Sequence, residues 1–300
     1  MIIYPKPLKA GDKVAILSPA SHIKEALIDG ACNVLSQWGF EPVVCSHCKG
    51  RCGTYSASTE ERLADLLWAL DEPSVRAIMC SRGGYGVVHL LHELSPALLS
   101  RDPKWLIGFS DISALHAAWV HAGVASMHAP MAKHLCECGI DDCCSKEILN
   151  VLTGGKPQYE IKAHEFNRQG AATGQLLGGN LAVLSGLLGT PFNILEADKI
   201  LFIEDIGEDV YKIERMLYSL KLGGVLERLK GLIVGQFTEY QSPDRNGESM
   251  YDMIRRMVAT YDYPVAFNFP VGHVDDNRPL IEGADVELSV TSGNTTLKFL

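Results

Sequence analysis

The stretch LIGFSDISALHAAWVHAG, residues 106–123, joins a short apolar run to a segment whose apolar residues have helical spacing. Ser110 stands at the junction, and Asp111 follows it. Strands that run into helices build parallel α/β sheets, and such a turn exposes the side chain at the junction. Ser110 is therefore either an exposed nucleophile or, with Asp111, the cap of the helix. The pattern alone favours a cap, because caps are far more common than nucleophiles.

The rest of the first half repeats this alternation of strand and helix. Apolar runs predict strands over residues 13–18, 41–45, 75–80, 105–109 and 124–128. Helical spacing predicts helices over residues 24–38, 59–71, 86–94 and 111–122. Ser58 and Glu61 form a capping box at the start of the second helix. These elements predict a parallel sheet with helices on both faces, and ligands bound beyond the carboxyl ends of its strands.

A polar segment with Gly-Gly and Pro punctuation covers residues 146–170. We interpret it as a linker between an N-terminal domain over residues 1–145 and a C-terminal domain over residues 171–300, since 300 residues commonly form two domains. The second half is also α/β, with additional strands near its end. Its predicted strands include residues 171–177, 200–205 and 231–235, and its predicted helices cover residues 180–189, 209–221 and 249–260.

The composition argues against several classes of protein. A net charge of −9 and the lack of any Lys or Arg run argue against a nucleic-acid partner. The longest apolar stretches fall far short of the roughly 20 residues that a membrane span needs. The N-terminus has no long apolar signal segment, so we expect a cytoplasmic protein without membrane contact. No GxGxxG or GxxxxGKS motif follows a predicted strand, and we expect no cofactor.

Seven of the nine cysteines fall into two short clusters. These are CSHCKGRC, residues 45–52, and CECGIDDCC, residues 136–144. A zinc site assembled from them is geometrically conceivable. The spacing matches no paired CxxC pattern, however, and cytosolic thiols are commonly structural, so we expect no bound metal.

Two further segments carry candidate catalytic groups. The segment SRGGYG, residues 81–86, follows a predicted strand, and its flexible amides could stabilise an oxyanion or form a plain tight turn. Glu204 and Asp205 end the apolar run ILFIED, residues 200–205. A carboxylate there costs desolvation energy unless it is paired, so we expect a partner such as an imidazole. Alternatively, either acid caps the helix that begins near residues 207–209.

Ten histidines compete for the role of general base. His116 and His121 lie along the helix that begins near Ser110. Six residues of helix rise about 9 Å, which is too far for His116 to turn back to the serine. His273 instead follows Gly272 in the irregular stretch NFPVGHVDDNRPL, residues 268–280, where positioned catalytic residues commonly lie.

Together these features resemble the LD-carboxypeptidases, the muramoyltetrapeptide carboxypeptidase family of serine peptidases. The resemblance spans nearly the whole chain, through LKAGDKVAILSPAS, TEERLADLLWAL, CSRGGYG, LIGFSDISAL, MHAPM, GQLLGGNLAVLSGLLGTPF, LFIEDIGEDVYKIERML and FPVGHVDDNRPLIEGADVEL. It implies a triad of nucleophile, acid and base, formed by Ser110, Glu204 and His273. It also implies that the oxyanion donors are backbone amides, those of Asp111 and of Gly83 or Gly84.

The resemblance further implies an N-terminal nucleophile domain and a C-terminal domain that supplies Glu204 and His273. The active site would lie in the cleft between them, and homodimers are common in the family. The implied reaction removes a terminal D-alanine from an L-centre, usually diaminopimelate or lysine, in cytoplasmic murein tetrapeptides, and leaves a tripeptide for recycling. Arg82, beside the glycine pair, is our candidate for binding the substrate's terminal carboxylate. On this interpretation a single turn starts the helix at Asp111 and presents Ser110.

The chain departs from the family pattern at two places, and two other functions stay open. CSHCKGRCGTYSA, residues 45–57, replaces a loop that is usually poor in cysteine, and MHAPM has Ala129 where glycine is expected. The self-immunity hydrolases of peptidyl or aminoacyl nucleotide antibiotics share the resemblance, but they tend to be longer. A non-catalytic small-molecule binding protein is the alternative from another class, and it leaves Ser110, Glu204 and His273 uncoupled.

Overall fold

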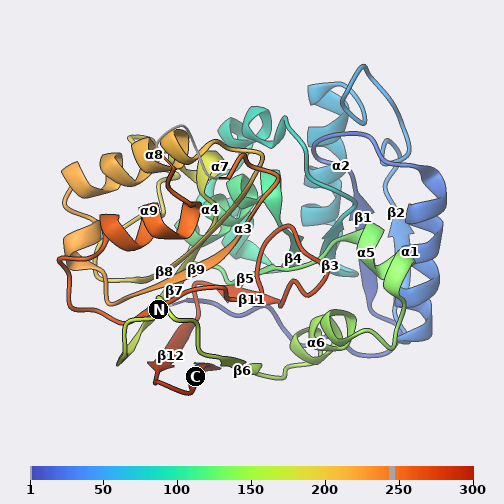
Figure 1. The fold of residues 1–300 in the computed structure, drawn as a ribbon. Helices are drawn as coiled ribbons and strands as arrows, with labels where there is room; N and C mark the ends of the chain where they lie inside the picture. The colour runs from blue at the N-terminus through green and yellow to red at the C-terminus, as the bar shows by residue number, and fades with distance from the viewer. Residues whose placement is uncertain (1, 243–246) are drawn as a thin grey trace. The chain divides into compact units, whose positions relative to one another are not determined.

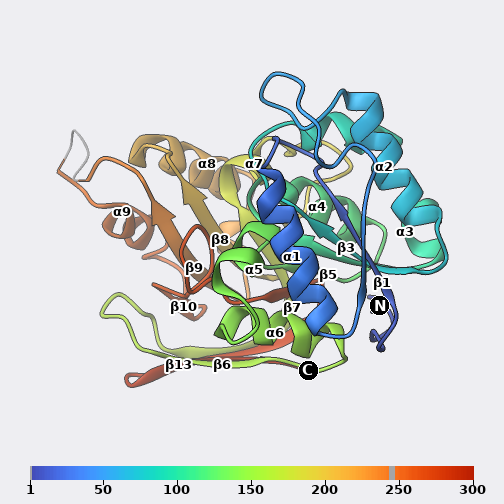
Figure 2. The same ribbon diagram turned by 90° about the vertical axis from the view of Figure 1, so that its right-hand side faces the viewer.

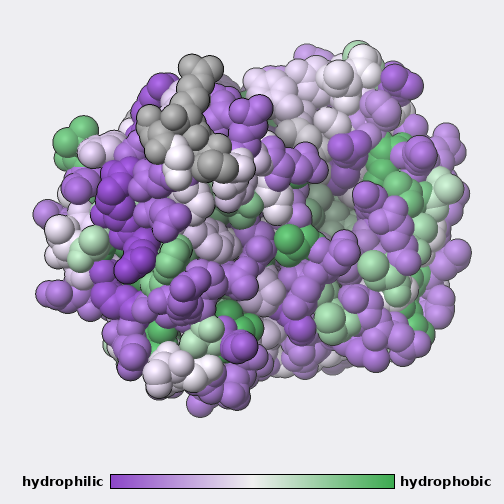
Figure 3. All heavy atoms as spheres, viewed as in Figure 1, coloured by the Kyte–Doolittle hydropathy of each residue, from purple (hydrophilic) through white to green (hydrophobic). Residues whose placement is uncertain are grey.

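The computed structural model describes residues 2–242 and 247–300, and the chain divides into two compact units. The first unit comprises residues 1–155 and 278–283, and the second comprises residues 156–277 and 284–300. Apolar side chains of the strands are buried in both units. On the face drawn in Figure 3, hydrophilic residues predominate and hydrophobic residues form small groups. Within the described residues, no helix is both long enough and apolar enough to cross a membrane.

The first unit is built on a six-stranded sheet (Figure 1). In spatial order its strands are β11 (Leu280–Glu282), β5 (Ser126–His128), β4 (Trp105–Gly108), β3 (Val75–Cys80), β1 (Lys13–Leu17) and β2 (Glu41–Val44). Strands β1 to β5 pair in parallel, which confirms the predicted parallel sheet, and β11 adds an antiparallel edge. The order 2-1-3-4-5 is that of a doubly wound sheet, whose ligands bind at the carboxyl ends of the strands.

The helices of the first unit follow the predicted pattern with some differences. They are α1 (Glu25–Gln37), α2 (Thr59–Asp71), α3 (Pro96–Arg101), α4 (Ser113–His121), α5 (Ala132–Cys138) and α6 (Cys143–Leu152), with 3-10 helices η1 (Val87–Glu93) and η2 (Ser110–Ile112). The capping box of Ser58 and Glu61 is present at α2. The element predicted over residues 86–94 is a 3-10 helix that follows the left-handed Gly86 and has no side-chain cap. Helix α4 is buried on all sides from Ser113 to Trp119, so it is a core helix.

The second unit contains a seven-stranded mixed sheet (Figure 2). In spatial order its strands are β10 (Val265–Ala266), β9 (Gly231–Thr238), β8 (Ile200–Ile206), β7 (Gly170–Asn180), β12 (Asp285–Val290), β13 (Asn294–Phe299) and β6 (Gln158–Lys162). The first part of β7 pairs antiparallel with β12, and its last part pairs in parallel with β8. The helices are α7 (Leu181–Ser185), α8 (Val210–Leu222) and α9 (Met250–Met257), with the 3-10 helix η3 (Leu226–Arg228).

The segment interpreted as a linker, residues 146–170, contains regular structure. Most of α6 and the whole of β6 fall within it, and the boundary along the chain between the two units falls between Gly155 and Lys156. Asp142 caps α6 by accepting a hydrogen bond from the Ser145 amide, and the apolar face of α6 is buried. β6 pairs with β13, which follows about 130 residues later in the chain. We interpreted the segment as a linker because of its polar composition. An edge strand and the exposed face of a helix are also polar, so composition does not distinguish them from a linker.

Candidate active site

Ser110 lies two residues beyond the end of β4, in a strained backbone turn. Its φ is 66°, in the left-handed region that residues other than glycine rarely adopt. Such a conformation costs about 1–3 kcal/mol and persists only where the surrounding structure enforces it. A sharp, strained turn between a strand and a helix is the geometry of a nucleophile elbow. The sequence predicted the turn from strand to helix but gave no sign of the left-handed backbone.

The Asp111 side chain does not cap the helix that follows Ser110, contrary to our expectation. Neither η2 nor α4 begins with a side-chain cap. The Asp111 carboxylate instead accepts a hydrogen bond of 3.0 Å from the Val87 amide, at the start of η1. Burial raises the pKa of Asp111, whereas the hydrogen bond from Val87 opposes that shift. The carboxylate thus joins the turn at Ser110 to the chain that follows the segment SRGGYG.

The glycine pair of SRGGYG lies against the Ser110 turn. A Cβ atom on Gly83 would stand 2.9 Å from the Ser110 Cβ, 3.0 Å from its Oγ and 3.2 Å from the Asp111 amide nitrogen. A Cβ atom on Gly84, where φ is 117°, would meet the Ser21 Oγ at 2.2 Å. Only glycine allows the backbone to approach so closely at these two positions. The structure therefore brings Gly83 and the Asp111 amide, both predicted to stabilise an oxyanion, into contact with Ser110.

Arg62, which the sequence analysis did not single out, holds this glycine segment. Its side chain is buried, and its Nη1 donates to the carbonyls of Pro19 at 2.6 Å and Gly86 at 2.9 Å. The guanidinium also lies over the Tyr55 ring, 4.9 Å from its centroid. A signal was available, because Arg62 shares the buried face of α2 with Leu66. A charge on that face must find partners inside the protein.

Arg82, the predicted ligand of the substrate carboxylate, is exposed. Its Nη1 donates to the His22 carbonyl at 3.2 Å. Arg82 precedes Gly83 in the chain, so its backbone belongs to the segment that lies against Ser110. The exposed guanidinium could leave the His22 carbonyl for a carboxylate, which would form a stronger, charge-assisted hydrogen bond.

His116 has a structural explanation in the first unit. Its Nε2 donates to the Gly108 carbonyl at 2.8 Å, and its Nδ1 lies 2.8 Å from the Ser126 hydroxyl. Nδ1 therefore accepts the hydroxyl proton, because Nε2 must carry the proton that the carbonyl requires. Burial lowers the pKa of His116 to about 4. The ring is a neutral bridge between β4 and β5, and it fixes the strand end that precedes Ser110.

In the second unit, Glu204 and His273 form a hydrogen-bonded pair. Glu204 is completely buried within β8, and its Oε2 lies 2.8 Å from the His273 Nδ1. Gly272, where φ is 122°, makes room for this contact, since a Cβ there would stand 2.9 Å from the Glu204 Oε2. The side chain of Asn277, also missed by the sequence analysis, accepts a hydrogen bond from the Gly272 amide at 3.0 Å. The imidazole partner expected for a carboxylate at this strand end is thus present.

The charges around His273 favour its protonated form. Burial works to lower the pKa of His273, but the hydrogen bond to Glu204 and the carboxylate charges of Glu204, Asp205 and Glu239 together raise it. Because Nδ1 donates to the carboxylate, Nε2 is the atom that can take up a proton. A histidine in this state can accept a proton from a nucleophile and is stabilised once it has done so.

The Asp205 carboxylate accepts hydrogen bonds from backbone amides and from Asn180, and its role differs from that of Glu204, which binds the His273 imidazole. It accepts hydrogen bonds from the Asn180 side chain at 3.0 Å and from the amides of Ala182 and Ile206, each at 2.8 Å. Burial, followed by the nearby charge of Glu204, raises the pKa of Asp205 to about 7. The sequence also allows one of these acids to cap the helix after residue 207. Asp205 instead binds the first turn of α7, and Asp209 at the start of α8 forms no side-chain cap.

A pocket of about 350 Å³ lies in the second unit beside the loop that carries His273. Pro270 and Val274 of that loop form part of its lining. Lys162, Gln236 and Asn268 add an ammonium group and two amides. The Lys162 ammonium and the Asn268 amide can donate to carboxylates and peptide carbonyls. The Gln236 amide donates to Asn268 and to the Phe269 carbonyl, and Asp276 adds a carboxylate to the lining. The pocket therefore suits a polar peptide better than an apolar ligand.

Comparisons with known proteins agree with the resemblance in the sequence. The family model described as "LD-carboxypeptidase N-terminal domain" matches residues 14–129. The family model described as "LD-carboxypeptidase C-terminal domain" matches residues 173–288. A protein of Bacillus subtilis named "probable murein peptide carboxypeptidase" is 30% identical over 308 residues, which cover 98% of this chain and 94% of that protein.

Solved structures show the same fold. The crystal structure of muramoyltetrapeptide carboxypeptidase from Oxalobacter formigenes matches with a TM-score of 0.88 and 29% identity, and covers 96% of this chain and 98% of that chain. The microcin C7 self-immunity protein matches with a TM-score of 0.87 over 99% of this chain and 98% of its own, but at 20% identity that likeness concerns the fold alone. The chain therefore belongs to the LD-carboxypeptidase family.

Proposed function

We propose that this protein is a serine-type LD-carboxypeptidase that removes the terminal D-alanine of murein tetrapeptide during peptidoglycan recycling in the cytoplasm. The observation that carries the proposal is the left-handed turn at Ser110 with the Gly83 backbone against it. A plain helix cap needs neither the strain nor the close glycine. The buried Glu204–His273 pair supplies the base and the group that orients it.

The proposed mechanism divides the work between the two units. His273 Nε2 takes the proton of Ser110 Oγ as that oxygen attacks the carbonyl of the L-residue. Glu204 keeps the proton on Nδ1 and stabilises the imidazolium that forms. The amides of Asp111 and of Gly83 or Gly84 stabilise the oxyanion. D-alanine leaves with the proton from His273. His273 then takes a proton from the water that attacks the acyl-enzyme, and returns it to Ser110 Oγ as the acyl group leaves.

The substrate's terminal carboxylate is assigned to Arg82 in this proposal. The pocket that contains Lys162, Gln236 and Asn268 is a candidate for the remainder of the peptide. Arg82→Gln should raise KM for the tetrapeptide by up to about fivefold with little change in kcat, because an exposed charge pair contributes at most about 1 kcal/mol. An unchanged KM would assign the carboxylate to another group.

The test of the function is the release of D-alanine from purified murein tetrapeptide by the purified protein. We expect turnover by the native chain and by Ser219→Ala, which changes an exposed serine of α8, and none by Ser110→Ala. An aminoacyl nucleotide analogue serves as the parallel substrate. Its preferred hydrolysis would favour a self-immunity hydrolase, and binding without hydrolysis of either compound would favour a binding protein.

The assembly and the preferred peptide are further parts of the proposal. The family resemblance supports a homodimer, which light scattering of the purified protein tests directly. A panel of tetrapeptides that vary the third residue, with and without the sugar, would identify the preferred substrate. D-alanine release that depends on diaminopimelate or lysine at that position would support murein as the source.

A further inference from the structure

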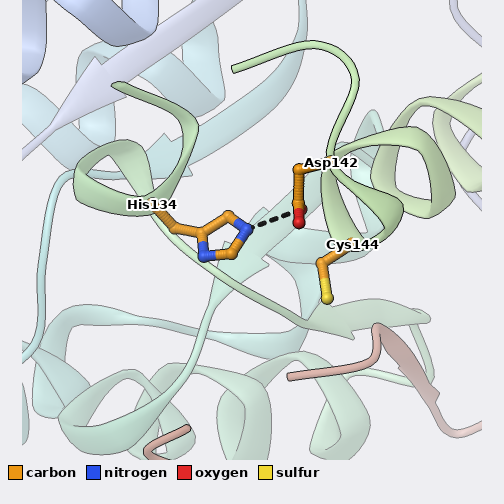
Figure 4. A group of neighbouring side chains, drawn as sticks. All are labelled: His134, Asp142 and Cys144. Carbon is orange, nitrogen blue, oxygen red and sulfur yellow. Dashed lines mark hydrogen bonds and ion pairs between the residues drawn. The ribbon is translucent and has the colours of Figure 1, made fainter. Parts of the chain in front are cut away.

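The connection between α5 and α6 gathers metal-binding side chains outside the proposed catalytic groups. His134 lies on α5, Asp142 is the N-cap of α6, and Cys144 is in the first turn of α6. Figure 4 shows the imidazole projecting from α5 toward Asp142, with the Cys144 sulfur beside it. The His134 Nε2 lies 2.8 Å from the Asp142 Oδ2, and the candidate ligand atoms of all three residues lie within 4.8 Å of one another.

Local structure explains why these residues meet. Helix α5 ends at Gly139, where φ is 73°, and the chain turns back so that the start of α6 faces α5. Asp142 is fixed there because it accepts a hydrogen bond of 2.9 Å from the Ser145 amide. Cys144 is completely buried, whereas the side chains of His134 and Asp142 are 14% and 21% exposed. The cluster is therefore held by the fold and can be reached from solvent.

Another cysteine of the same segment has a packing role. A Cβ atom on Gly30 of α1 would stand 2.1 Å from the Cys136 Sγ, so this sulfur occupies the space beside the glycine. Helix α5 packs against α1 (Figure 2). Cys136 therefore joins two helices, and the potential ligands lie elsewhere on the α5–α6 connection. This separation within one cysteine cluster cannot be read from the spacing of the cysteines.

The three donors suit a borderline soft divalent cation. Zn²⁺ binds imidazole nitrogen, carboxylate oxygen and thiolate sulfur at about 2.0–2.3 Å, which places tetrahedral ligand atoms about 3.3–3.8 Å apart. The candidate ligand atoms lie within 4.8 Å of one another, so some of them must move closer together when the ion binds. Burial works to raise the pKa of Asp142, but hydrogen bonds from His134 and the Ser145 amide outweigh it and lower the pKa, so the carboxylate is charged. Mg²⁺ and Ca²⁺ prefer all-oxygen sites.

We propose that His134, Asp142 and Cys144 bind one Zn²⁺ ion that ties the start of α6 to α5. The ion displaces the hydrogen bond between His134 and Asp142, the imidazole proton moves to Nδ1, and the Cys144 thiol releases its proton to solvent. Water or the neighbouring Cys143 completes the coordination, and the Cys143 Sγ lies 3.9 Å from the Cys144 Sγ. This spacing is close to that of two thiolates on one tetrahedral ion, about 3.8 Å.

The spacing of the cysteines alone predicts no metal site. The structure adds a histidine and a carboxylate that lie eight residues apart and meet only because the chain reverses between α5 and α6. The proposed site shares no residue with Ser110, Glu204 or His273. Zinc binding and D-alanine release can therefore be tested separately in the same full-length protein.

The test is metal binding to the full chain after treatment with a chelator. Titration with Zn²⁺ against a chromophoric chelator should give one equivalent, and Co²⁺ should show a thiolate charge-transfer band with the visible bands of four-coordination. His134→Gln should weaken Zn²⁺ binding by at least about tenfold, and Cys144→Ser should also remove the charge-transfer band. Cys52→Ser and His92→Gln, which change an exposed cysteine and an exposed histidine, should leave binding unchanged.

Two outcomes would overturn the proposal. One is the lack of Zn²⁺ binding by the native chain, and the other is binding that persists at full affinity in His134→Gln. Substitution of the buried Cys144 can disturb folding, so His134→Gln is the deciding variant, with circular dichroism to show that it is folded. Zinc should also raise the melting temperature of the native chain but not that of His134→Gln, because binding to the native state stabilises it.

Discussion

The two units hold their proposed catalytic groups by different physical means. In the first unit, backbone geometry holds Ser110: a left-handed residue, a glycine in contact with it and a buried arginine on neighbouring carbonyls. In the second unit, a charged hydrogen bond holds His273, whose partner Glu204 is completely buried. The serine is positioned by sterics and strain, which pH does not change. The histidine is positioned by a charge, and its state changes with pH.

Glycine nevertheless has the same use in both units. Gly83 leaves space for the Ser110 side chain, and Gly272 leaves space for the Glu204 side chain; a Cβ at either position would come within 2.9 Å of them. Gly272 also has a φ of 122°, whereas Gly83 lies outside the left-handed range. A methyl group at residue 83 therefore acts by sterics alone. Variants that change the backbone strain, the charge or the close approach of a glycine one at a time can therefore distinguish the two ways of positioning the catalytic groups.

The largest effect should come from removing the nucleophile. Ser110→Ala and Ser110→Gly should each lower D-alanine release by at least about 10⁴-fold, because the members of a triad act as a unit. The two variants should differ in stability. Glycine relieves the left-handed strain, so Ser110→Gly should be about 1 kcal/mol more stable than Ser110→Ala in denaturant unfolding. Equal stability of the two would mean that the turn is not strained.

Removing the charge of Glu204 should have the next largest effect. Glu204→Gln keeps the shape of the side chain, but it no longer holds the proton of His273 on Nδ1. The substitution should lower kcat by about 10⁴-fold. Its residual activity should also differ in pH dependence. The base must be neutral, so kcat/KM of the native protein rises as pH passes upward through the raised pKa of His273. In Glu204→Gln that rise should move to lower pH, since burial remains and the carboxylate is gone.

The contribution of His273 to the free energy of unfolding should decrease as pH rises. The pKa of His273 is raised by folding, so its contribution is fully present below the unfolded value of about 6.5 and is lost as pH rises through the folded value. Denaturant unfolding of the native protein and Glu204→Gln over that range measures the difference. Glu208→Gln is the matched control, because this residue pairs with Lys212 on the surface of the same unit. The same pH dependence of stability in all three proteins would contradict the role given to Glu204.

A methyl group at residue 83 should have an intermediate effect. Gly83→Ala would push against Ser110 and the Asp111 amide, and should lower kcat by about 10²–10³-fold, the usual cost of losing one oxyanion donor. Gly293→Ala is the control, because a Cβ there meets no atom within 4 Å and its φ lies outside the left-handed range. Initial rates of D-alanine release compare the two variants. Similar rates in both would separate Gly83 from the chemistry.

The sequence predicted the elements better than it predicted the contacts between them. Alternating apolar runs predicted β1 to β5 and β7 to β9, because burial of a parallel strand leaves a local signal. The desolvation cost of a carboxylate at the end of β8 predicted a partner for it, and the structure supplies His273. The sequence could not predict that Asp111 binds the Val87 amide. Such a contact joins residues 24 positions apart and depends on the path of the backbone between them.

The smallest catalytic effect should come from Arg62, which touches none of the proposed reacting groups. Arg62→Lys keeps the charge but cannot reach the carbonyls of both Pro19 and Gly86 in the same geometry. Each carbonyl left without its donor costs about 1–3 kcal/mol of stability. We expect the variant to unfold at lower denaturant concentration and to lose about tenfold in kcat.

The pH profile of Arg62→Lys distinguishes positioning from simple instability. Arg62 binds the segment that also contains Gly83, the residue in contact with Ser110, and it does not touch His273. The pH at which kcat/KM rises should therefore stay at its native value while kcat falls. Arg76→Lys is the matched control, since its guanidinium bonds to Asp102 and to the Pro73 carbonyl rather than to the glycine segment. A loss of kcat in Arg62→Lys alone would show that the first unit's backbone geometry is tuned for catalysis. Equal losses of kcat in both variants would mean that Arg62 contributes only to folding.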